Sequence, residues 1–274
     1  MIFSAWNTAA TIDEGLLMTL HDALNIDLNI SELISVVGAG GKTSTMFNLA
    51  QELKAFGKKV LVTTTTNIAF SETAKADRLI IDDSKNICSL SGGEPGTIVC
   101  LGRGILNDNG KLRGVDREFI DIIYREQLFD YVVVEADGSK RKPIKAPAHY
   151  EPVIPRETTR VVGVIGLDAL GKRITEDYVH RPDLFCSITG RKMGDIIDRK
   201  CFTDLILSED GLFKDAPQGC RKYVVLNKAD HPDRKKEAKM TVHELIEMKS
   251  PVTGLIIAAT EEGYINVEWF SSKA

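Results

Sequence analysis

Apolar and polar residues alternate along the chain in two rhythms, one typical of buried strands and one typical of amphipathic helices. The apolar run at Glu32–Val37 ("ELISVV") predicts a strand, and from Met46 to Leu53 apolar residues recur on one helical face until Gly57. A second strand is predicted directly afterwards, at Lys59–Thr63. Because strand, helix and strand cross over in the right-handed sense, both strands should lie parallel in one sheet.

The same alternation continues towards the end of the chain. Further strands are expected at Arg78–Ile81, Thr97–Leu101, Tyr131–Ala136, Arg160–Ile165, Lys222–Leu226 and Gly254–Ala258, and helices at Asp116–Phe129, Asp183–Thr189, Asp195–Leu207 and Asp233–Met248. This order predicts a three-layer α/β fold with a mostly parallel central sheet and helices on both faces.

The length of 274 residues suits one domain. We expect a single domain over residues 1–274, with a helical extension at 1–30 and a mainly helical insertion at 167–219. The extension is indicated by Thr11, which precedes Glu14 by three residues as in a capping box, and by leucines that follow on one helical face.

Composition narrows the classes of function. Apolar residues make up 43% and charged residues 27% of the chain, and the net charge of -4 provides no global attraction for nucleic acid or an anionic membrane. The five cysteines form no C-x-x-C pair and are expected to be reduced thiols, while the histidines show no metal-ligand spacing. With no signal peptide or long apolar segment in view, we expect a cytoplasmic protein with neither a nucleic acid nor a membrane partner.

Ser35–Ser44 ("SVVGAGGKTS") is typical of a phosphate-binding loop between a strand and a helix. Its glycines permit positive φ, so backbone amides can surround a phosphate, and the lysine and helix N-terminus add positive charge. Val36 stands where G-x-x-x-x-G-K-[ST] has its first glycine, and the alternative is a turn with an exposed lysine. The predicted phosphate-binding residues are Gly38, Ala39, Gly40, Gly41, Lys42, Thr43 and Ser44. With this loop, the three-layer α/β fold is expected to be P-loop NTPase-like.

A phosphate loop of this kind requires a carboxylate for magnesium at the end of another strand. Glu135 and Asp137 follow the predicted strand "YVVV", and either could hold Mg²⁺ together with Thr43, although a cap or turn would also explain acidic residues there. Thr64 ends the second strand, where its hydroxyl could contact phosphate or magnesium, or could simply reflect the strand preference of threonine.

The segment "YVVLNKAD" places Asn227, Lys228 and Asp230 after a strand in the N-K-x-D arrangement that reads guanine. A carboxylate that accepts hydrogen bonds from guanine would be left unpaired by adenine, so GTP is favoured over ATP. Ala258, at the end of the next predicted strand, could present its backbone amide to the base. The alternative is a helix cap at Asp230.

A cationic segment follows the two acidic residues. Lys140 and Lys145 within it could stabilise charge on a transferred phosphoryl group or hold a second anion, and His180 and Arg181 could reach the same anion. Charge runs are also common in solvated loops. The candidate catalytic residues are therefore Lys42, Glu135, Asp137, Lys140 and Lys145.

Taken together, "GAGGKTS", "LVTTTTNI", "VVVEADGSKRKPIKAPAHYEPVIP", "IGLDALGKRITEDYVHRPDLF" and "VVLNKAD" resemble the YqeC family. The resemblance implies an accessory role in the maturation of selenium-dependent molybdenum hydroxylases, in which a selenium-containing cofactor is built or inserted. Together with the glycine loop and the residues at the strand ends, it leads us to expect a Mg²⁺-dependent nucleoside triphosphatase that serves this maturation. Its partners would be GTP or ATP, a selenium species or molybdopterin-type cofactor, and the client hydroxylase.

Two other functions remain open from the sequence. One is an ATP-dependent small-molecule kinase or ligase, and the other is a nucleotide-gated chaperone that carries a cofactor without significant turnover. The sequence also leaves open whether the protein forms a homodimer.

Overall fold

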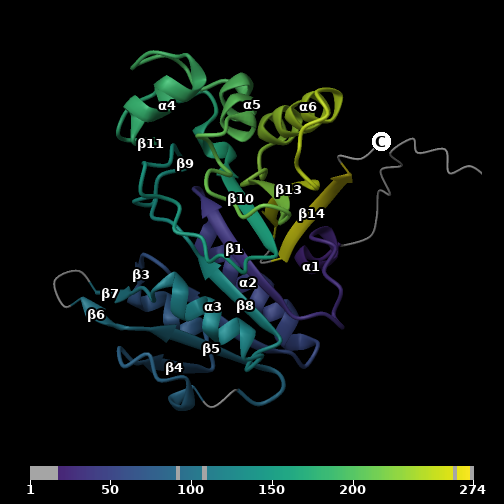
Figure 1. Ribbon diagram of the computed structural model, residues 1–274. Coiled ribbons are helices and arrows are strands. Elements are labelled where there is room, and N and C mark those ends of the chain that lie inside the picture. The colour runs from purple at the N-terminus through teal and green to yellow at the C-terminus, as the bar shows by residue number, and fades with distance from the viewer. Residues whose placement is uncertain (1–17, 91–92, 107–109, 262–263, 272–274) are drawn as a thin grey trace, which may run out of the picture.

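A nine-stranded sheet forms the centre of the molecule (Figure 1), in a computed structural model that describes residues 18–90, 93–106, 110–261 and 264–271. The strand order is β14-β13-β12-β10-β1-β8-β2-β5-β4, and all neighbours are parallel except β13 and β14. The strands are β1 (Glu32–Gly38), β2 (Lys59–Thr64), β4 (Arg78–Ile81), β5 (Thr97–Gly102), β8 (Tyr131–Glu135), β10 (Arg160–Gly166), β12 (Arg221–Asn227), β13 (Gly254–Glu261) and β14 (Tyr264–Ser271).

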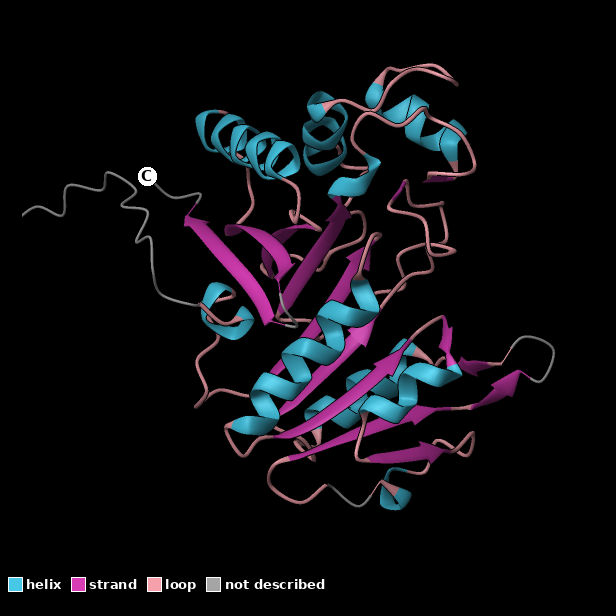
Figure 2. Cartoon of the chain, turned by 180° about the vertical axis from the view of Figure 1, so that it is seen from behind, coloured by secondary structure: helices cyan, strands magenta, loops and turns pink. Residues whose placement is uncertain are grey.

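Helices cover both faces of this sheet. They are α1 (Leu20–Ala23), α2 (Lys42–Ala55), α3 (Arg117–Arg125), α4 (Pro182–Thr189), α5 (Arg199–Leu207) and α6 (Pro232–Glu247), with short 3-10 helices η1 (Phe70–Lys75), η2 (Ile87–Ser89) and η3 (Leu167–Ala169). Apolar residues of α1 and α2 pack on one face, where α2 lies along the strands in Figure 2. Residues of α3, α5 and α6 pack on the other, and the predicted three-layer α/β fold with a mostly parallel sheet is confirmed.

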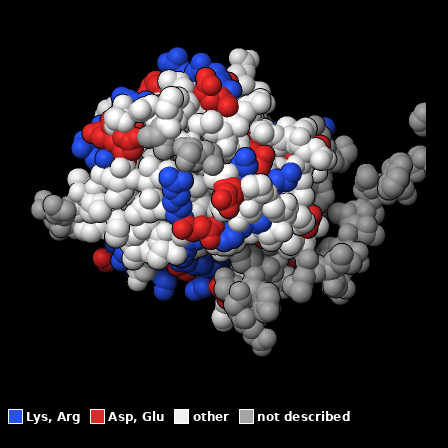
Figure 3. Space-filling model, turned by 90° about the horizontal axis from the view of Figure 1, so that it is seen from below, with Lys and Arg blue, Asp and Glu red and all other residues white. Residues whose placement is uncertain are grey.

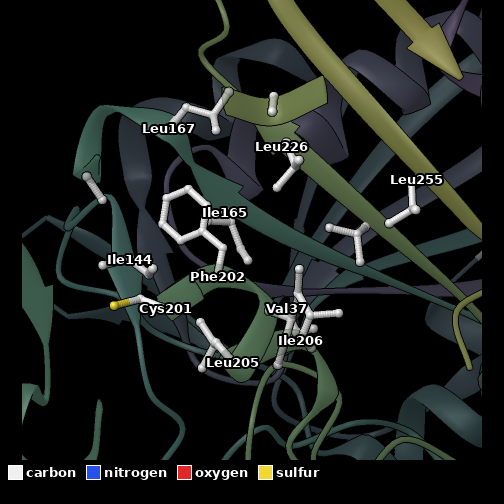
Figure 4. Packing of buried hydrophobic residues seen from close by; sticks show 14 of the residues in the cluster. Val37, Ile144, Ile165, Leu167, Cys201, Phe202, Leu205, Ile206, Leu226 and Leu255 are labelled. Atoms are coloured by element: carbon white, nitrogen blue, oxygen red, sulfur yellow. The ribbon is translucent and has the colours of Figure 1, made fainter. Parts of the chain in front are cut away.

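Side chains that alternate along the strands build the two faces. In β1, Ile34 and Val36 join the cluster under α2, whereas Val37 joins the cluster under α5. Figure 4 shows Phe202, Leu205 and Ile206 of α5 packed among strand residues that include Val37, Ile165 and Leu226. The sheet is thus buried on both sides, which explains its nearly continuous apolar strands.

Two small sheets extend the carboxyl-terminal edge of the central sheet. β3 (Asn67–Ala69), β7 (Lys111–Arg113) and β6 (Gly104–Leu106) are antiparallel, and β9 (Ile144–Lys145) pairs in parallel with β11 (Val179–His180). None of these short strands was predicted, because two or three residues are too few to establish a pattern. β14 was not predicted either, although Gly263 directly before it in the sequence is a turn signal that could have revealed it.

Several predicted boundaries shift for local reasons. The helix expected from Asp195 begins at Arg199, because the side chain of Asp198 accepts a hydrogen bond from Cys201 N and caps it. The helix expected to run to Phe129 ends at Arg125, and Gln127 takes a positive φ of 51°.

The N-terminal extension is described only from residue 18, so the predicted Thr11–Glu14 cap lies outside the described residues. The first described helix, α1, begins instead with a capping box between Thr19 and Asp22.

A buried ion pair joins two neighbouring strands near their amino ends. Arg160 is fully buried and donates through Nε and Nη2 to the two carboxylate oxygens of Glu32, at 2.9 and 2.8 Å. Arg221 donates to the same carboxylate at 2.8 Å, and the ring of Tyr223 lies under the Arg160 guanidinium. This geometry fixes β1 and β10 together opposite the end of the sheet that carries the glycine loop.

The outer surface carries both signs of charge. On the face seen in Figure 3, basic and acidic side chains are interspersed, in keeping with the small net charge. In the described part of the chain, no helix is long and apolar enough to span a membrane.

Candidate functional site

The glycine loop connects β1 to α2 in a conformation that only glycine adopts easily. Gly38, Gly40 and Gly41 have φ values of 94°, 80° and 135°. A Cβ on Gly40 would lie 2.4 Å from the backbone of Gly166, and one on Gly41 would lie 2.1 Å from Nδ2 of Asn227. Glycine is therefore required at these positions both by the positive φ values and by the close contact of the loop with Gly166 and Asn227.

Lys42, at the start of α2, is buried between two carboxylates. Its Nζ donates to the carbonyl oxygen of Gly38 at 2.9 Å and lies 3.2 Å from Asp137 Oδ1 and 3.6 Å from Glu135 Oε1. Burial opposes the charged form, but the carboxylates of Asp137 and Glu135 outweigh it and raise the pKa of Lys42 above its usual value. The lysine therefore stays charged although only 3% of its surface is exposed.

Glu135, the last residue of β8, lies beside the first turn of α2. Its Oε2 accepts a hydrogen bond from Thr43 Oγ1 at 2.6 Å. Burial raises the pKa of Glu135, although Lys42 acts in the opposite direction. A hydroxyl and a carboxylate oxygen thus lie together at the helix N-terminus, and their role in holding magnesium stays a prediction.

Asp137 is held more firmly than Glu135. Its Oδ2 accepts a hydrogen bond from Gly38 N at 3.0 Å and lies 2.8 Å from Lys145 Nζ, while Oδ1 faces the Lys42 ammonium. Both oxygens therefore face cations of the protein, although Oδ1 has no hydrogen-bond partner among the described residues. The structure brings Glu135 and Asp137 to the same loop, but only the carboxylate of Glu135 lies against Thr43.

Lys145 extends this network away from the loop. Its buried ammonium donates to Gly138 O and to Glu151 Oε2, both at 2.8 Å, and Arg181 Nη1 lies 2.9 Å from the same Glu151 oxygen. Burial favours the neutral acid, yet Arg181 and Lys145 together lower the pKa of Glu151. The connected network from Lys42 to Arg181 contains three cations and three carboxylates.

His180, next to Arg181, is kept neutral by its surroundings. Burial, followed by the charges of Arg181 and Lys145, lowers the pKa of His180 to about 4. The sequence pointed to His180 and Arg181 as residues that could reach an anion. In the structure, Arg181 is instead engaged by Glu151 and by the carbonyl oxygen of Ala146.

The cationic segment does not form one patch. Lys140 is exposed and has a φ of 48°, whereas Lys145 is turned inward to its carboxylates. Lys142 Nζ donates to the carbonyl oxygen of Asp177 at 3.0 Å. These lysines diverge, so their joint role towards a second anion stays a prediction.

The N-K-x-D segment lies beside the glycine loop. Asn227 Nδ2 donates to Gly40 O at 2.9 Å, which links the end of β12 to the loop. Lys228 Nζ lies 2.6 Å from Asp168 Oδ2, and Asp230 is exposed two residues later. The carbonyl of Ala258 accepts a hydrogen bond from Ala229 N at 3.0 Å, so β13 supports the same turn.

The remaining predicted residues have clear positions. Ser44 is exposed on the first turn of α2, and Ala39 is buried with its N–H donating to Val164 O at 2.8 Å. The hydroxyl of Thr64 is buried and donates to the carbonyl oxygen of Glu135 at 2.8 Å. Thr64 therefore positions the backbone of Glu135 and does not direct its hydroxyl to the loop.

Two carboxylates in this region were missed by the sequence reasoning. Asp168 comes directly after the strand that ends at Gly166, and the rule that acidic residues follow strand ends, which found Glu135, could have found it. Glu151 lies in a segment without helix or strand, and no sequence pattern marked it as the partner of Lys145.

Comparison with known proteins gives one clear family. The model of the YqeC protein family matches residues 34–183. The "Uncharacterized protein YqeC" of Escherichia coli (strain K12) is 37% identical over 209 residues, which is 75% of this chain and 80% of that protein.

Solved structures are similar only at a distance. Chloroplast FtsY from Physcomitrella patens has a TM-score of 0.46 and 15% identity, over 89% of this chain and 63% of that chain. The MinC:MinD cell division protein complex of Aquifex aeolicus has a TM-score of 0.42 and 13% identity, over 83% of this chain and 81% of the matched chain. These likenesses are too weak to indicate a function.

Proposed function

Because the chain belongs to the YqeC family and carries the glycine loop described above, we propose that it binds and hydrolyses a nucleoside triphosphate with Mg²⁺. The observation that carries the proposal is the buried ammonium of Lys42, held at the loop between Glu135 and Asp137. A lysine in this position, at the N-terminus of a helix that follows three glycines with positive φ, suits a bound phosphate chain.

The charges around the loop support the requirement for magnesium. The three cations of the network are already matched by three carboxylates, so the site has no surplus positive charge for a triphosphate. Magnesium is commonly held by one or two protein oxygens together with phosphate oxygens. Among the described residues, no group of three or more Asp, Glu, His or Cys side chains is placed to hold a metal ion by itself. Thr43 and Glu135 therefore fit a cation that arrives with the nucleotide.

The residues have separable roles in this proposal. Backbone amides from Gly38 to Thr43 and the Lys42 ammonium bind phosphate, while Thr43 and Glu135 hold Mg²⁺, which would neutralise charge that develops on the phosphoryl group. Asp137 positions the loop through Gly38 N and orients Lys42. Water then attacks the terminal phosphate and yields the diphosphate and inorganic phosphate.

We further propose that the base is guanine. Asn227 is tied to the loop at Gly40, so the N-K-x-D turn lies close to any bound nucleotide, and Asp230 is exposed beyond it. A carboxylate at that place would accept hydrogen bonds from guanine N1 and N2 and leave adenine unmatched.

The test is a calorimetric titration with Mg-GTP and Mg-ATP. We expect GTP to bind more tightly, Asp230→Ala to remove the preference, and Asp233→Ala, an exposed acidic residue three positions later, to preserve it. Lys42→Ala should weaken both nucleotides, whereas Lys54→Ala on the same helix should not. Equal nucleotide affinity in wild type and Lys42→Ala would exclude this loop as the site.

The wider role comes from the family resemblance alone. We propose that hydrolysis supports the maturation of a selenium-dependent molybdenum hydroxylase in the cytoplasm. Cells that carry Lys42→Ala in place of the wild type should produce the hydroxylase polypeptide in an inactive form. Full hydroxylase activity in those cells would contradict this role.

A further inference from the structure

A polar pocket of about 350 Å³ lies next to the proposed magnesium residues. It is lined by Thr65 and Thr66 after β2, by Arg113 of β7 and by the first turn of α3. The backbone N–H of Thr65 donates to the carbonyl oxygen of Glu135 at 3.1 Å, so the pocket shares a wall with the glycine-loop site. Its volume is in the range of pockets that hold small molecules.

Guanidinium groups dominate the chemistry of this pocket. Arg103, Arg113 and Arg117 all line it. Arg103 is bound by Asp83 and Asp116, at 2.6 and 2.5 Å, and Arg117 forms an ion pair with its exposed neighbour Glu118 at 3.0 Å. Arg113 is exposed, and within the described ranges its guanidinium has no carboxylate at ion-pair distance.

The two carboxylates of the lining do not cancel these charges. Asp116 is shared between Arg103 and Lys85, which lies outside the lining at 2.5 Å from Asp116 Oδ2. Glu118 is paired with Arg117 on the exposed side of the helix. Arg113 therefore remains available to an anion, and a guanidinium matches carboxylate and phosphate groups through two parallel hydrogen bonds.

Two further groups of the lining are suited to an anion. The hydroxyl oxygen of Thr65 is buried and has no hydrogen-bond partner among the described residues. The first turn of α3 has no side-chain cap, so its backbone N–H groups and helix dipole are directed outward beside the pocket.

We propose that this pocket binds a second substrate, a small molecule that bears a phosphate or carboxylate group, with Arg113 as its principal anchor. Arg117 and the Thr65 hydroxyl complete the anion contacts. The assignment of this molecule as a second substrate rests on the nucleotide site proposed above, because the pocket adjoins that site through Thr65 and Glu135. Binding of the anion depends on the pocket alone.

This location differs from the cationic segment that the sequence suggested for a second anion. Lys145 of that segment is already engaged by Asp137 and Glu151. The arginine pocket lies on the other side of Glu135, towards β2 and β5, where no carboxylate of the described residues pairs with Arg113.

The test is calorimetric titration of the nucleotide-free protein with two probes, glycerol 3-phosphate and succinate. We expect at least one probe to bind with a Kd below about 10 mM and Arg113→Ser to weaken it about tenfold or more. Lys111→Ser is the matched control: Lys111 is exposed, lies two residues away on the same face of β7 and does not line the pocket. It should change the Kd less than twofold.

A repeat titration with saturating Mg-GDP separates this proposal from that of the glycine loop. A probe held in the arginine pocket keeps its affinity when nucleotide is present, whereas a probe bound at the glycine loop is displaced. Displacement, equal binding by wild type and Arg113→Ser, or no binding of either probe would overturn the proposal. If Mg-GDP fails to bind while the Arg113 dependence holds, the nucleotide proposal fails and the anion pocket stands.

Discussion

Replacing Lys42 by Met should destabilise the nucleotide-free protein strongly, although methionine has a similar length and fills the same space. The substitution removes an ammonium that lies 3.2 Å from Asp137 and 3.6 Å from Glu135 and that donates to Gly38 O. Asp137 keeps Lys145 as a partner, but among the described residues the Glu135 carboxylate keeps only the Thr43 hydroxyl. Removal of one partner from a buried ion pair costs about 3–5 kcal/mol, which corresponds to a fall in Tm of roughly 10 °C in a protein of this size.

The penalty should depend on pH through Glu135. Burial already raises the pKa of Glu135, and Lys42 counteracts that increase. A carboxyl group whose folded-state pKa is raised contributes stability below its unfolded value of 4.5, and this contribution is lost as pH rises through the folded pKa. Without Lys42 the pKa of Glu135 rises further, so the loss of stability in Lys42→Met should be smaller at pH 5 than at pH 8.

Thermal melts followed by circular dichroism at the two pH values would check this reasoning. The matched control is Lys54→Met on the same helix, because Lys54 forms a partly exposed ion pair with Asp77 that should contribute only about 0.2–1 kcal/mol. The argument is refuted if Lys42→Met melts within about 2 °C of the wild type at both pH values. A penalty that is larger at pH 5 than at pH 8 would refute the part assigned to Glu135.

Three further predictions concern the glycine loop, the Arg160–Glu32 ion pair and His180. Gly40→Ala should lower the free energy of unfolding by about 2–5 kcal/mol, because its Cβ would lie 2.4 Å from the backbone of β10 at a φ of 80°. The control Gly57→Ala, with open space at a φ of 74°, should cost about 1 kcal/mol in the same melts. Similar losses in the two variants would contradict the role of close packing. Arg160→Met should lower the free energy of unfolding, measured by urea titration, by about 3 kcal/mol, because it leaves the buried Glu32 carboxylate with the single cation Arg221. Adding Glu32→Gln to the same chain should recover part of that loss. No recovery would contradict the pairing. His180 has a folded-state pKa lowered to about 4, so its neutral form contributes stability that is lost as pH falls from about 6.5 to 4. His180→Gln should therefore flatten the dependence of the free energy of unfolding on pH over that window. An unchanged slope would contradict this assignment to His180.

The order of the central elements follows from the local pattern of the chain. Each strand of the parallel sheet buries both faces, so its apolar run is almost continuous and stands out from the amphipathic helices around it. The strands β1, β2, β8, β10 and β12 were therefore predicted to within one or two residues at each end. Three glycines followed by a lysine likewise marked the loop, because positive φ values leave a signature in residue type.

What the sequence could not decide is which charged side chains meet. Lys145 and Glu151 are only six residues apart, yet their contact with each other and with Asp137 depends on how an irregular segment folds back on the sheet. The arginine pocket depends on the same kind of information, since Arg113 and Thr65 line one pocket only because β7 pairs with β3 beyond the end of β2.

The sequence by itself determined the layers, the loop and the carboxylates at the strand ends, because hydrophobic periodicity and glycine are local signals. The tertiary structure alone decided that the Lys42 ammonium is paired with Glu135 and Asp137 and that Lys145 is turned inward. It also decided that Arg113 has no carboxylate at ion-pair distance among the residues that the structure describes. The physical reason is that the strength of a charge interaction depends on the distance between the two groups and on their burial. Residues far apart in the chain come close together and become buried only when the sheet has formed.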